Sequence, residues 1–326
     1  MNQLYPLKFK PIFKEKIWGG HKIKTKLGLD FSPLPNCGEA WILSGVAGSQ
    51  TKVMNGFLKG NELNDLLEVY MDDLVGESVF EKHREEFPIL IKLIDANDYL
   101  SIQVHPDDQF AAKMNLGNGK TEFWYILDAD KDAEVIIGFN RKMDRETYLE
   151  YFITGKLKEI LNVEKVKKSD VLYIPAGRIH SLGPGLLLAE IQQTSDTTYR
   201  IYDWDRVDDK GNSRELHTGL ALDAIDFTMY DSYRTHYRKT LNKTETLVES
   251  PYFTTNILEF DRTVHKDFSW LDSFVIYVCT EGSAMIHYGD EKEILKTGES
   301  LLLPAMLKEF DLLPVTNCKL LEVFIS

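Results

Sequence analysis

Residues able to bind a metal occur at the ends of three strand-like segments of the chain. In the segment 99–107, YLSIQVHPD, apolar residues alternate with polar ones, and the polar positions include Gln103 and His105. A period of two predicts a strand with one polar face, so these two side chains point the same way. Glu122 begins the next long apolar run, and His180 follows a Pro-Ala turn further on. We therefore predict one cluster drawn from three strands.

These donors suit a catalytic metal better than a structural one. They offer one amide oxygen, two imidazoles and one carboxylate, and catalytic zinc is held by such N and O ligands with one position left open. No thiolate, the usual ligand of closed structural zinc sites, belongs to the set. Two histidines and a carboxylate also bind Fe(II), so Fe(II), Mn(II) and Co(II) remain alternatives. A lone histidine in an apolar strand is more often a packing residue, and we assign the other six histidines to packing or the surface.

A further acidic residue is a candidate proton carrier. The segment 185–193, GLLLAEIQQ, reads as a strand in which Glu190 shares one face with two leucines. Burial raises the pKa of a carboxyl group towards the range in which it exchanges protons near neutral pH. Glu190 is therefore a candidate base or proton relay. The alternative is an ordinary ion pair with Arg200 or Lys120.

The elements that must position these residues are short strands that occur twice. Segment 169–180, SDVLYIPAGRIH, resembles 298–309, GESLLLPAMLKE, and each copy is preceded by an apolar run, at 123–127 and at 274–278. Short strands punctuated by Gly and Pro at this spacing are typical of jelly-roll barrels. We predict a mainly β chain with two such barrels in tandem.

The two copies differ at the candidate ligands. Where the first copy has Glu122 and His180, we align Ser273 and Glu309 in the second. The second barrel therefore has no matching ligand set, and one metal per chain is expected.

The polar and charged segment 231–245 reads as the linker between the barrels. We predict a catalytic domain over residues 1–240 and a C-terminal domain without metal ligands over 241–326. Helical periodicity and capping residues predict short helices in the N-terminal half, at 62–70, 106–114 and 144–161, with the last one split by Gly155.

Composition excludes several classes of partner. The 38 Lys and Arg against 51 Asp and Glu give a net charge of −13, which repels nucleic acids and anionic membranes. An anionic substrate requires basic residues concentrated in its pocket. The three cysteines form no disulfide framework or CxxC motif. The N-terminus has no signal-peptide pattern, and no apolar stretch is long enough to span a membrane. These features predict a cytoplasmic protein, and they leave its oligomeric state open.

Four segments together resemble type I mannose-6-phosphate isomerases, in their short bacterial form. The segments are PILIKLIDANDYLSIQVHPDDQ (88–109), GKTEFWYIL (119–127), VLYIPAGRIHSLG (171–183) and AEIQQTSDTTYRIYDWDR (189–206). The likeness runs in order over roughly residues 5–240. The IQxHPD and IPAGxxH motifs in this order are specific, whereas either one alone would indicate only a cupin.

This resemblance implies a cupin-fold enzyme that interconverts mannose 6-phosphate and fructose 6-phosphate with one zinc ion. By their place in the motifs, the zinc ligands are Gln103, His105, Glu122 and His180. Arg200 matches the arginine regarded as catalytic, and Lys120 and Ser101 match positions near the substrate. Short forms lack the large helical insert of the longer enzymes, so the way in which phosphate is held stays open.

The residues are compatible with this chemistry. Aldose–ketose isomerisation moves a proton between C1 and C2 through a cis-enediol(ate), which needs a base and stabilisation of a negative oxygen. Arg200 stays protonated and can stabilise that charge, while Ser101, Lys120 and Arg200 can bond to phosphate. Arg141 and Lys142 are exposed alternatives for the phosphate.

Two other classes of function use similar residues. A metal-dependent cupin oxygenase or epimerase shares the fold and the ligand types, so the fold cannot discriminate. A non-enzymatic sugar-binding cupin would carry a vestigial metal site. The complete ligand set, together with Lys120 and Arg200, argues against the second alternative.

Overall fold

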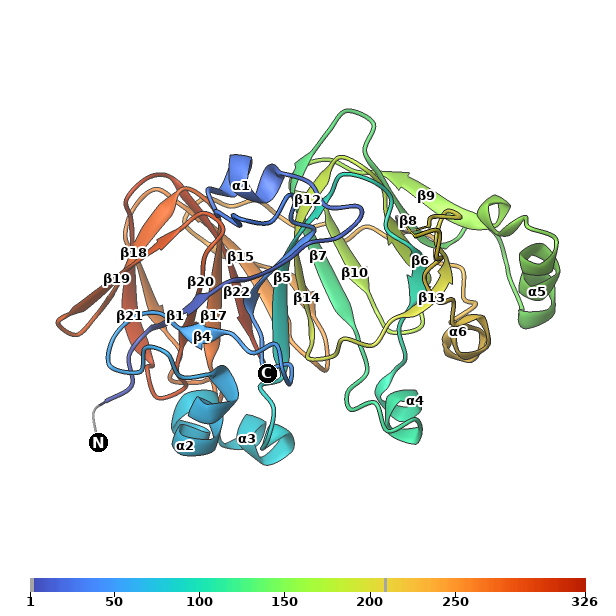
Figure 1. Ribbon diagram of the computed structural model, residues 1–326. Helices are drawn as coiled ribbons and strands as arrows, with labels where there is room; N and C mark the ends of the chain where they lie inside the picture. The colour runs from blue at the N-terminus through green and yellow to red at the C-terminus, as the bar shows by residue number, and fades with distance from the viewer. Residues whose placement is uncertain (1–2, 208–209) are drawn as a thin grey trace.

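The computed structural model describes residues 3–207 and 210–326, and most of its ordered elements are antiparallel strands in four sheets (Figure 1). The six-stranded sheet has the order β10 (Val171–Ile174), β7 (Glu122–Ala129), β12 (Leu186–Gln193), β5 (Ile89–Ala96), β3 (Glu39–Leu43), β2 (Ile12–Lys14). The five-stranded sheet has the order β13 (Tyr199–Tyr202), β6 (Ile102–Val104), β11 (His180–Leu182), β8 (Glu134–Phe139), β9 (Leu161–Lys165). We call these two sheets the N-terminal sandwich. The prediction of a mainly β chain is confirmed.

The other two sheets form what we call the C-terminal sandwich. The seven-stranded sheet has the order β14 (Thr244–Glu249), β15 (Thr254–Phe260), β22 (Cys318–Phe324), β17 (Val275–Glu281), β20 (Ser300–Leu303), β1 (Leu7–Lys10), β4 (Lys52–Val53). The four-stranded sheet has the order β16 (Val264–Asp267), β21 (Glu309–Pro314), β18 (Ser283–Tyr288), β19 (Glu291–Lys296).

Three hydrophobic cores hold these sheets in four layers. Alternate residues of β7 and β12 face opposite sides of the six-stranded sheet, as the period of a strand requires. Trp124 and Leu188 pack towards the five-stranded sheet, whereas Phe123 and Ala189 pack towards the seven-stranded sheet. A separate core lies inside the C-terminal sandwich. The six- and seven-stranded sheets are therefore the inner layers of one continuous molecule.

The predicted division at residue 240 needs a correction at its start. β1 pairs with β20, and β4 pairs with β1, so two strands from the beginning of the chain complete the seven-stranded sheet. The free edge of β20 offers unpaired backbone groups, and an N-terminal strand satisfies them. This long-range pairing leaves no local signal in the sequence.

The three predicted helices are confirmed, with shifted ends, and three others were not predicted. The helices are α1 (Lys22–Leu27), α2 (Leu63–Val75), α3 (Glu77–His83), α4 (Asp108–Lys113), α5 (Arg145–Ile153) and α6 (Thr218–Ala224). Gly155 ends α5 with a positive φ of 72° before a 3₁₀ turn, as the predicted split requires. α5 and α6 cover the outer side of the five-stranded sheet (Figure 1). Among the described residues, no helix is long and apolar enough to cross a membrane.

The predicted repeat is present in the strand order. The order β10-β7-β12-β5 recurs as β20-β17-β22-β15, and β6-β11-β8-β9 recurs as β16-β21-β18-β19. Each residue of the N-terminal sandwich can therefore be matched with a residue of the C-terminal sandwich by the register of the paired strands. Glu190 lies across from Lys92 and Trp124, and in the second set Glu322 lies across from Asn256 and Tyr277.

One proposed counterpart of the metal ligands was wrong by register. In the ladders anchored on Glu190 and Glu322, the position of Glu122 corresponds to Val275, two residues beyond Ser273. Glu309 is exposed and faces away from the sandwich, whereas His180 is buried. Glu309 begins β21 five residues after Pro304, as His180 begins β11 five residues after Pro175, so this counterpart keeps its place. Among the described residues, the group of side chains that could hold a metal ion is His105, Glu122 and His180, which lies in the N-terminal sandwich.

A buried ion pair occupies the matching place in the C-terminal sandwich. Glu322 is 2% exposed and accepts hydrogen bonds from Tyr277 Oη at 2.6 Å and Asn256 Nδ2 at 3.0 Å. Lys266, on β16, places its ammonium 2.5 Å from the same carboxylate. β16 is the counterpart of β6, which carries Gln103 and precedes His105. The Lys266 ammonium group therefore lies in the part of the C-terminal sandwich that corresponds to the candidate metal site.

We expect Lys266→Met to lower the free energy of unfolding by about 3–5 kcal/mol, because it leaves the Glu322 carboxylate buried without its cation. Urea unfolding followed by fluorescence measures the change. Adding Glu322→Gln should recover much of the loss. Arg145→Met, which breaks an exposed pair with Asp223, is the control and should cost less than about 1 kcal/mol. Equal effects of Lys266→Met and Arg145→Met would contradict this account.

Candidate metal centre and active-site cavity

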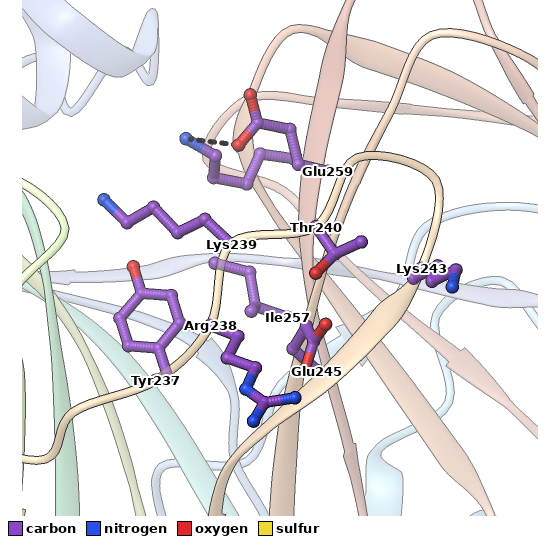
Figure 2. A pocket seen from close by; sticks show the side chains of 9 residues that line it. Tyr237, Arg238, Lys239, Thr240, Lys243, Glu245, Ile257 and Glu259 are labelled. Atoms are coloured by element: carbon purple, nitrogen blue, oxygen red, sulfur yellow. Dashed lines mark ion pairs between the residues drawn. The ribbon is translucent and has the colours of Figure 1, made fainter.

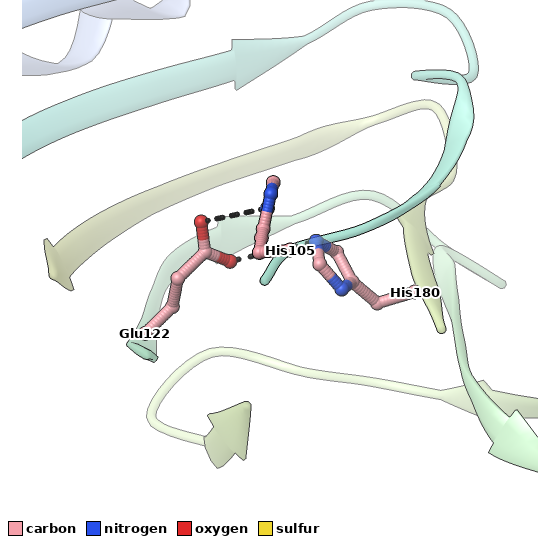
Figure 3. Close-up of side chains that lie close together, drawn as sticks. All are labelled: His105, Glu122 and His180. Carbon is pink, nitrogen blue, oxygen red and sulfur yellow. Dashed lines mark ion pairs between the residues drawn. The ribbon is translucent and has the colours of Figure 1, made fainter. Parts of the chain in front are cut away.

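Three buried side chains converge from three strands of the N-terminal sandwich (Figure 3). His105 directly follows β6, Glu122 is the first residue of β7, and His180 is the first residue of β11. His105 Nε2 lies 3.2 Å from Glu122 Oε1, and His180 Nε2 lies 3.5 Å from Glu122 Oε2. Ligand atoms about 2.0–2.1 Å from a tetrahedral zinc are about 3.3 Å apart, so these separations match such a centre.

Backbone carbonyl groups orient both imidazoles. His105 Nδ1 lies 2.9 Å from the carbonyl oxygen of Thr197, and His180 Nδ1 lies 2.9 Å from that of Arg178. A carbonyl only accepts, so in each ring Nδ1 carries the hydrogen and Nε2 keeps a lone pair. Both Nε2 atoms face Glu122. This outer hydrogen bond is the usual support of a metal-binding histidine.

The protonation states also suit a metal. Burial and the nearby Lys120 lower the pKa of His105 to about 3, and burial lowers the pKa of His180. Burial opposes ionisation of Glu122, but Lys120 and the two histidines outweigh it and hold the pKa of this carboxyl well below its ordinary value. Near neutral pH the cluster thus offers two neutral imidazoles and a carboxylate, the forms that bind metals.

Glu122 provides the test of whether a cation fits here. Both of its carboxylate oxygens are fully buried, and neither accepts a hydrogen bond within the described part of the chain. Lys120 Nζ is 2.9 Å from Oε1 as an ion pair, whereas the second oxygen lies 3.5 Å from the neutral imidazole of His180. A buried carboxylate in this state requires compensating positive charge, and a divalent cation between it and the two Nε2 atoms would supply it.

Gln103 completes the cluster on the side of His180. It pairs with His180 across the β6–β11 ladder, and its amide lies 3.2 Å from His180 Nε2. The amide oxygen and nitrogen exchange places by a simple rotation of the side chain, which would turn the oxygen towards the centre. The predicted shared orientation of Gln103 and His105 agrees with this arrangement.

A cavity of about 300 Å³ opens beside the cluster, and its walls carry both signs of charge. Five basic side chains line it: Lys16, Lys92, Lys120, Arg200 and Arg214. Three carboxylates line it as well: Glu39, Glu190 and Asp196. The concentration of basic residues that an anionic substrate would require in a chain of net charge −13 is therefore present.

Arg200, Lys120 and Ser101, which the family resemblance implies as catalytic or substrate-binding residues, all border this cavity. Arg200 lies across from Gln103 on the β13–β6 ladder, and its Nη1 donates to the carbonyl of Glu215 at 2.8 Å. Ser101 is buried next to Gln103, 3.4 Å from its amide oxygen. Lys120 contacts Glu122 and His105, so its ammonium lies at the metal end of the cavity. The exposed alternative Arg141 bonds to Asn140 and Glu159 and does not line the cavity.

Glu190 is buried in the cavity wall, and its ion-pair partner is neither Arg200 nor Lys120. Its Oε1 lies 3.0 Å from Lys92 Nζ, and its Oε2 accepts from Trp124 Nε1 at 3.0 Å. Burial and the charge of Glu122 raise the pKa of Glu190, against the opposing effect of Lys92. The raised pKa that the sequence suggested is present, whereas the suggested ion pair with Arg200 or Lys120 is replaced by one with Lys92.

Several cavity residues were missed by sequence reasoning. Lys92 had a usable signal, since it interrupts the apolar run 89–94, where an unpaired charge would be costly. Glu39 and Lys16 form an ion pair of 3.0 Å at the cavity wall, and Trp41 Nε1 donates to Glu39. Arg214 lies outside every strand and gave no periodic signal. These residues come from distant parts of the chain and meet only in the folded sheet.

A second hollow lies away from this centre. It is bordered by the segment Tyr237–Lys243 between the two sandwiches and by strands β14 and β15 (Figure 2). It measures about 20 Å³ and includes none of the candidate ligands. Its size and position do not suit a substrate.

Comparisons with known proteins identify the family of this chain. The chain matches the catalytic domain of type I phosphomannose isomerase over residues 6–139 and the cupin domain of mannose-6-phosphate isomerase over residues 243–324. It is 37% identical over 321 residues to mannose-6-phosphate isomerase ManA of Bacillus subtilis, covering 96% of this chain and 97% of the relative. Against mannose-6-phosphate isomerase of Streptococcus mutans it is 34% identical, covering 94% of each chain.

Solved structures give the same result. The crystal structure of mannose 6-phosphate isomerase from Bacillus subtilis superposes with a TM-score of 0.88 at 34% identity, covering 98% of this chain and 99% of that one. A zinc-bound mannose 6-phosphate isomerase superposes with a TM-score of 0.81 at 16% identity, covering 98% and 99%, which establishes a common fold alone. The chain belongs to the type I phosphomannose isomerase family.

Proposed function

We propose that this protein is a zinc-dependent isomerase that interconverts mannose 6-phosphate and fructose 6-phosphate. The observation that carries the proposal is the buried carboxylate Glu122 between two Nε2 atoms, at the end of a cavity lined by five basic side chains. The relatives at 34–37% identity over nearly the whole chain bear this enzyme's name. The physical arrangement and the family point to the same reaction.

Gln103, His105, Glu122 and His180 would hold one zinc ion per chain. When bound there, zinc acts as a Lewis acid that polarises the carbonyl and hydroxyl oxygens of the substrate. The carbonyl groups of Thr197 and Arg178 fix the two imidazoles before any metal arrives. Lys120, close to Glu122, orients the reacting end of the sugar and contributes positive charge there.

Arg200 stabilises the negative charge that develops as the substrate passes through a cis-enediol(ate). Its guanidinium stays protonated at neutral pH, and its Nε is buried without a hydrogen-bond partner in the described structure. An unpartnered charged donor beside the reacting atoms gains a partner only when charge appears on the substrate. Such an interaction favours the transition state over the ground state.

Glu190 is the proposed base that moves the proton between C1 and C2. Burial raises its pKa towards the working range, and Lys92 and Trp124 hold one oxygen each, which fixes the direction of the carboxyl group. Ser101 borders the same cavity and supplies a hydroxyl to the bound sugar phosphate.

We interpret the two sandwiches as two cupin-type jelly rolls in tandem. The catalytic unit comprises residues up to about 240, apart from the strands β1 and β4, and the C-terminal unit comprises 241–326. The recurring strand order supports this interpretation. The C-terminal unit has a structural role, since its matching polar cluster is closed by Lys266.

We expect His180→Ala to reduce the zinc content from about one ion per chain to a small fraction of that after loading and dialysis, because it removes one ligand of the centre. Plasma mass spectrometry measures the metal. His265→Ala removes an exposed histidine of the C-terminal sandwich and is the matched control. Equimolar zinc in His180→Ala would contradict the assignment.

In a coupled assay, the wild type should convert mannose 6-phosphate, lose activity with a chelator and regain it with zinc.

Arg200→Ala should lower kcat by at least about 100-fold while the zinc content stays unchanged, because it removes charge stabilisation from the transition state. Arg141→Ala is the control. Loss of zinc in Arg200→Ala would assign Arg200 to the metal centre instead. Bound iron with oxygen consumption in the wild type would favour an oxygenase and refute the isomerase.

Glu190→Gln should abolish the exchange of substrate hydrogen with deuterated solvent, because an amide cannot accept the proton. Nuclear magnetic resonance detects this exchange separately from turnover. Glu215→Gln, at an exposed position of the same region, is the control. Continued exchange at the rate of the wild type in Glu190→Gln would mean that another group is the base.

A further inference from the structure

Arg214 differs from Lys92 and Lys120 in the exposure of its side chain to solvent. Lys92 and Lys120 have side chains only 5% exposed, and each lies about 3 Å from a buried carboxylate of the wall. Lys16 is paired with Glu39 at 3.0 Å, and its side chain is 33% exposed. The side chain of Arg214 is 36% exposed, so Lys16 and Arg214 are the accessible cations among these four residues, and of the four only Arg214 carries a guanidinium group.

Asp203 holds Arg214 by one edge only. The carboxylate of Asp203 is nearly buried and accepts from Arg214 Nε at 2.6 Å and from Arg214 Nη2. A guanidinium has five N–H groups, so this fork leaves three of them free of Asp203, including both on Nη1. The fixed geometry of the fork presents the remaining edge in a defined orientation. A phosphate group accepts two parallel hydrogen bonds from such an edge.

Arg214 belongs to a cluster of three arginines, with Arg200 and Arg206. Asp203 also accepts from Arg206 at 2.7 Å, so one carboxylate serves two guanidinium groups. Arg206 lies 3.7 Å from Asp98 as well. Arg200 has no carboxylate partner within the described part of the chain. Asp98 and Asp203 thus form ion pairs with Arg206 and Arg214, whereas Arg200 is held by a backbone carbonyl group.

Arg200 and Arg214 are brought together by the backbone. Arg200 Nη1 donates to the carbonyl of Glu215, the residue after Arg214. The backbone N–H of His217 donates to the carbonyl of Arg200 at 2.7 Å. Burial and the nearby Arg214 lower the pKa of Arg200, as expected for two neighbouring like charges. This repulsion is relieved when an anion binds between or beside them.

We propose that Arg214 is the residue that binds the phosphate group of the substrate, and that Asp203 is the positioning residue that orients it. The proposal rests on the proposed function and names the group that selects phosphorylated over free sugars. It separates two arginines: Arg214 holds the phosphate throughout the reaction, and Arg200 responds to charge that develops at the reacting carbons. Lys120, at the metal end, is then not the phosphate ligand.

The test separates binding from catalysis by steady-state kinetics of zinc-loaded protein. Arg214→Gln should raise KM for mannose 6-phosphate by about 10- to 100-fold and change kcat by less than about 3-fold, since uniform binding is lost. Asp203→Asn should raise KM by a smaller factor, and Arg214→Lys should recover only part of the loss, because an ammonium cannot form the fork. Arg141→Gln, an exposed arginine outside the cavity, should leave both constants unchanged. A fall in kcat with unchanged KM in Arg214→Gln would overturn the assignment.

Calorimetric titration with inorganic phosphate tests the subsite without turnover. Binding to the zinc-loaded wild type should be at least about tenfold tighter than to Arg214→Gln and equal to that of Arg141→Gln. If the wild type binds phosphate through Arg214 but does not convert mannose 6-phosphate, the proposed function fails and the phosphate subsite stands. If the wild type is active and Arg214→Gln binds phosphate as tightly as the wild type does, the subsite is refuted and the isomerase stands. Circular dichroism of each variant identifies any loss of folding, and Arg214→Lys then replaces a variant that fails to fold.

Discussion

The arrangement of the N-terminal sandwich depends on a carboxylate that is buried without enough positive charge around it. Both oxygens of Glu122 are hidden from solvent, and within residues 3–207 and 210–326 the only lysine or arginine in contact with them is Lys120. Burying such a group costs several kcal/mol unless a counter-charge is held close by. The backbone carbonyls behind His105 and His180 turn two lone pairs towards it, so the protein is organised to receive a cation at this point.

The C-terminal sandwich meets the same constraint in another way. Glu190 and Glu322 occupy matching positions of matching ladders, and each is held by an aromatic donor and a second polar side chain. In the C-terminal sandwich, Lys266 brings an ammonium group to the carboxylate, and apolar Val275 replaces Glu122. One sandwich has thus filled its interior with its own cation and packed side chains. The other keeps a cavity of about 300 Å³ beside its carboxylates.

The cavity wall shows how a strongly acidic chain can receive an anion. Two of its three carboxylates are tied to a lysine, Glu39 to Lys16 and Glu190 to Lys92. Paired charges cancel at a distance, so the field at the entrance depends on Asp196 and on the arginines, which outnumber it. The separation of a metal end from an arginine-rich rim gives the cavity a polarity along which a sugar phosphate would align.

The sequence by itself determined the cluster His105, Glu122 and His180, the side on which Gln103 faces, and the strand-rich repeat. These features have local causes, because a period of two fixes side-chain direction and turn residues mark strand ends. The family resemblance added Arg200, Lys120 and Ser101, which all border the cavity. Only the tertiary structure decided which residues meet across strands. The pairing of β1 with β20, the bond of Lys92 to Glu190, the place of Arg214 and the correct counterpart of Glu122 all depend on register and long-range contacts. A single sequence carries no local signal for these, because each contact is set by how distant strands align in the sheet and not by the residues next to it in the chain.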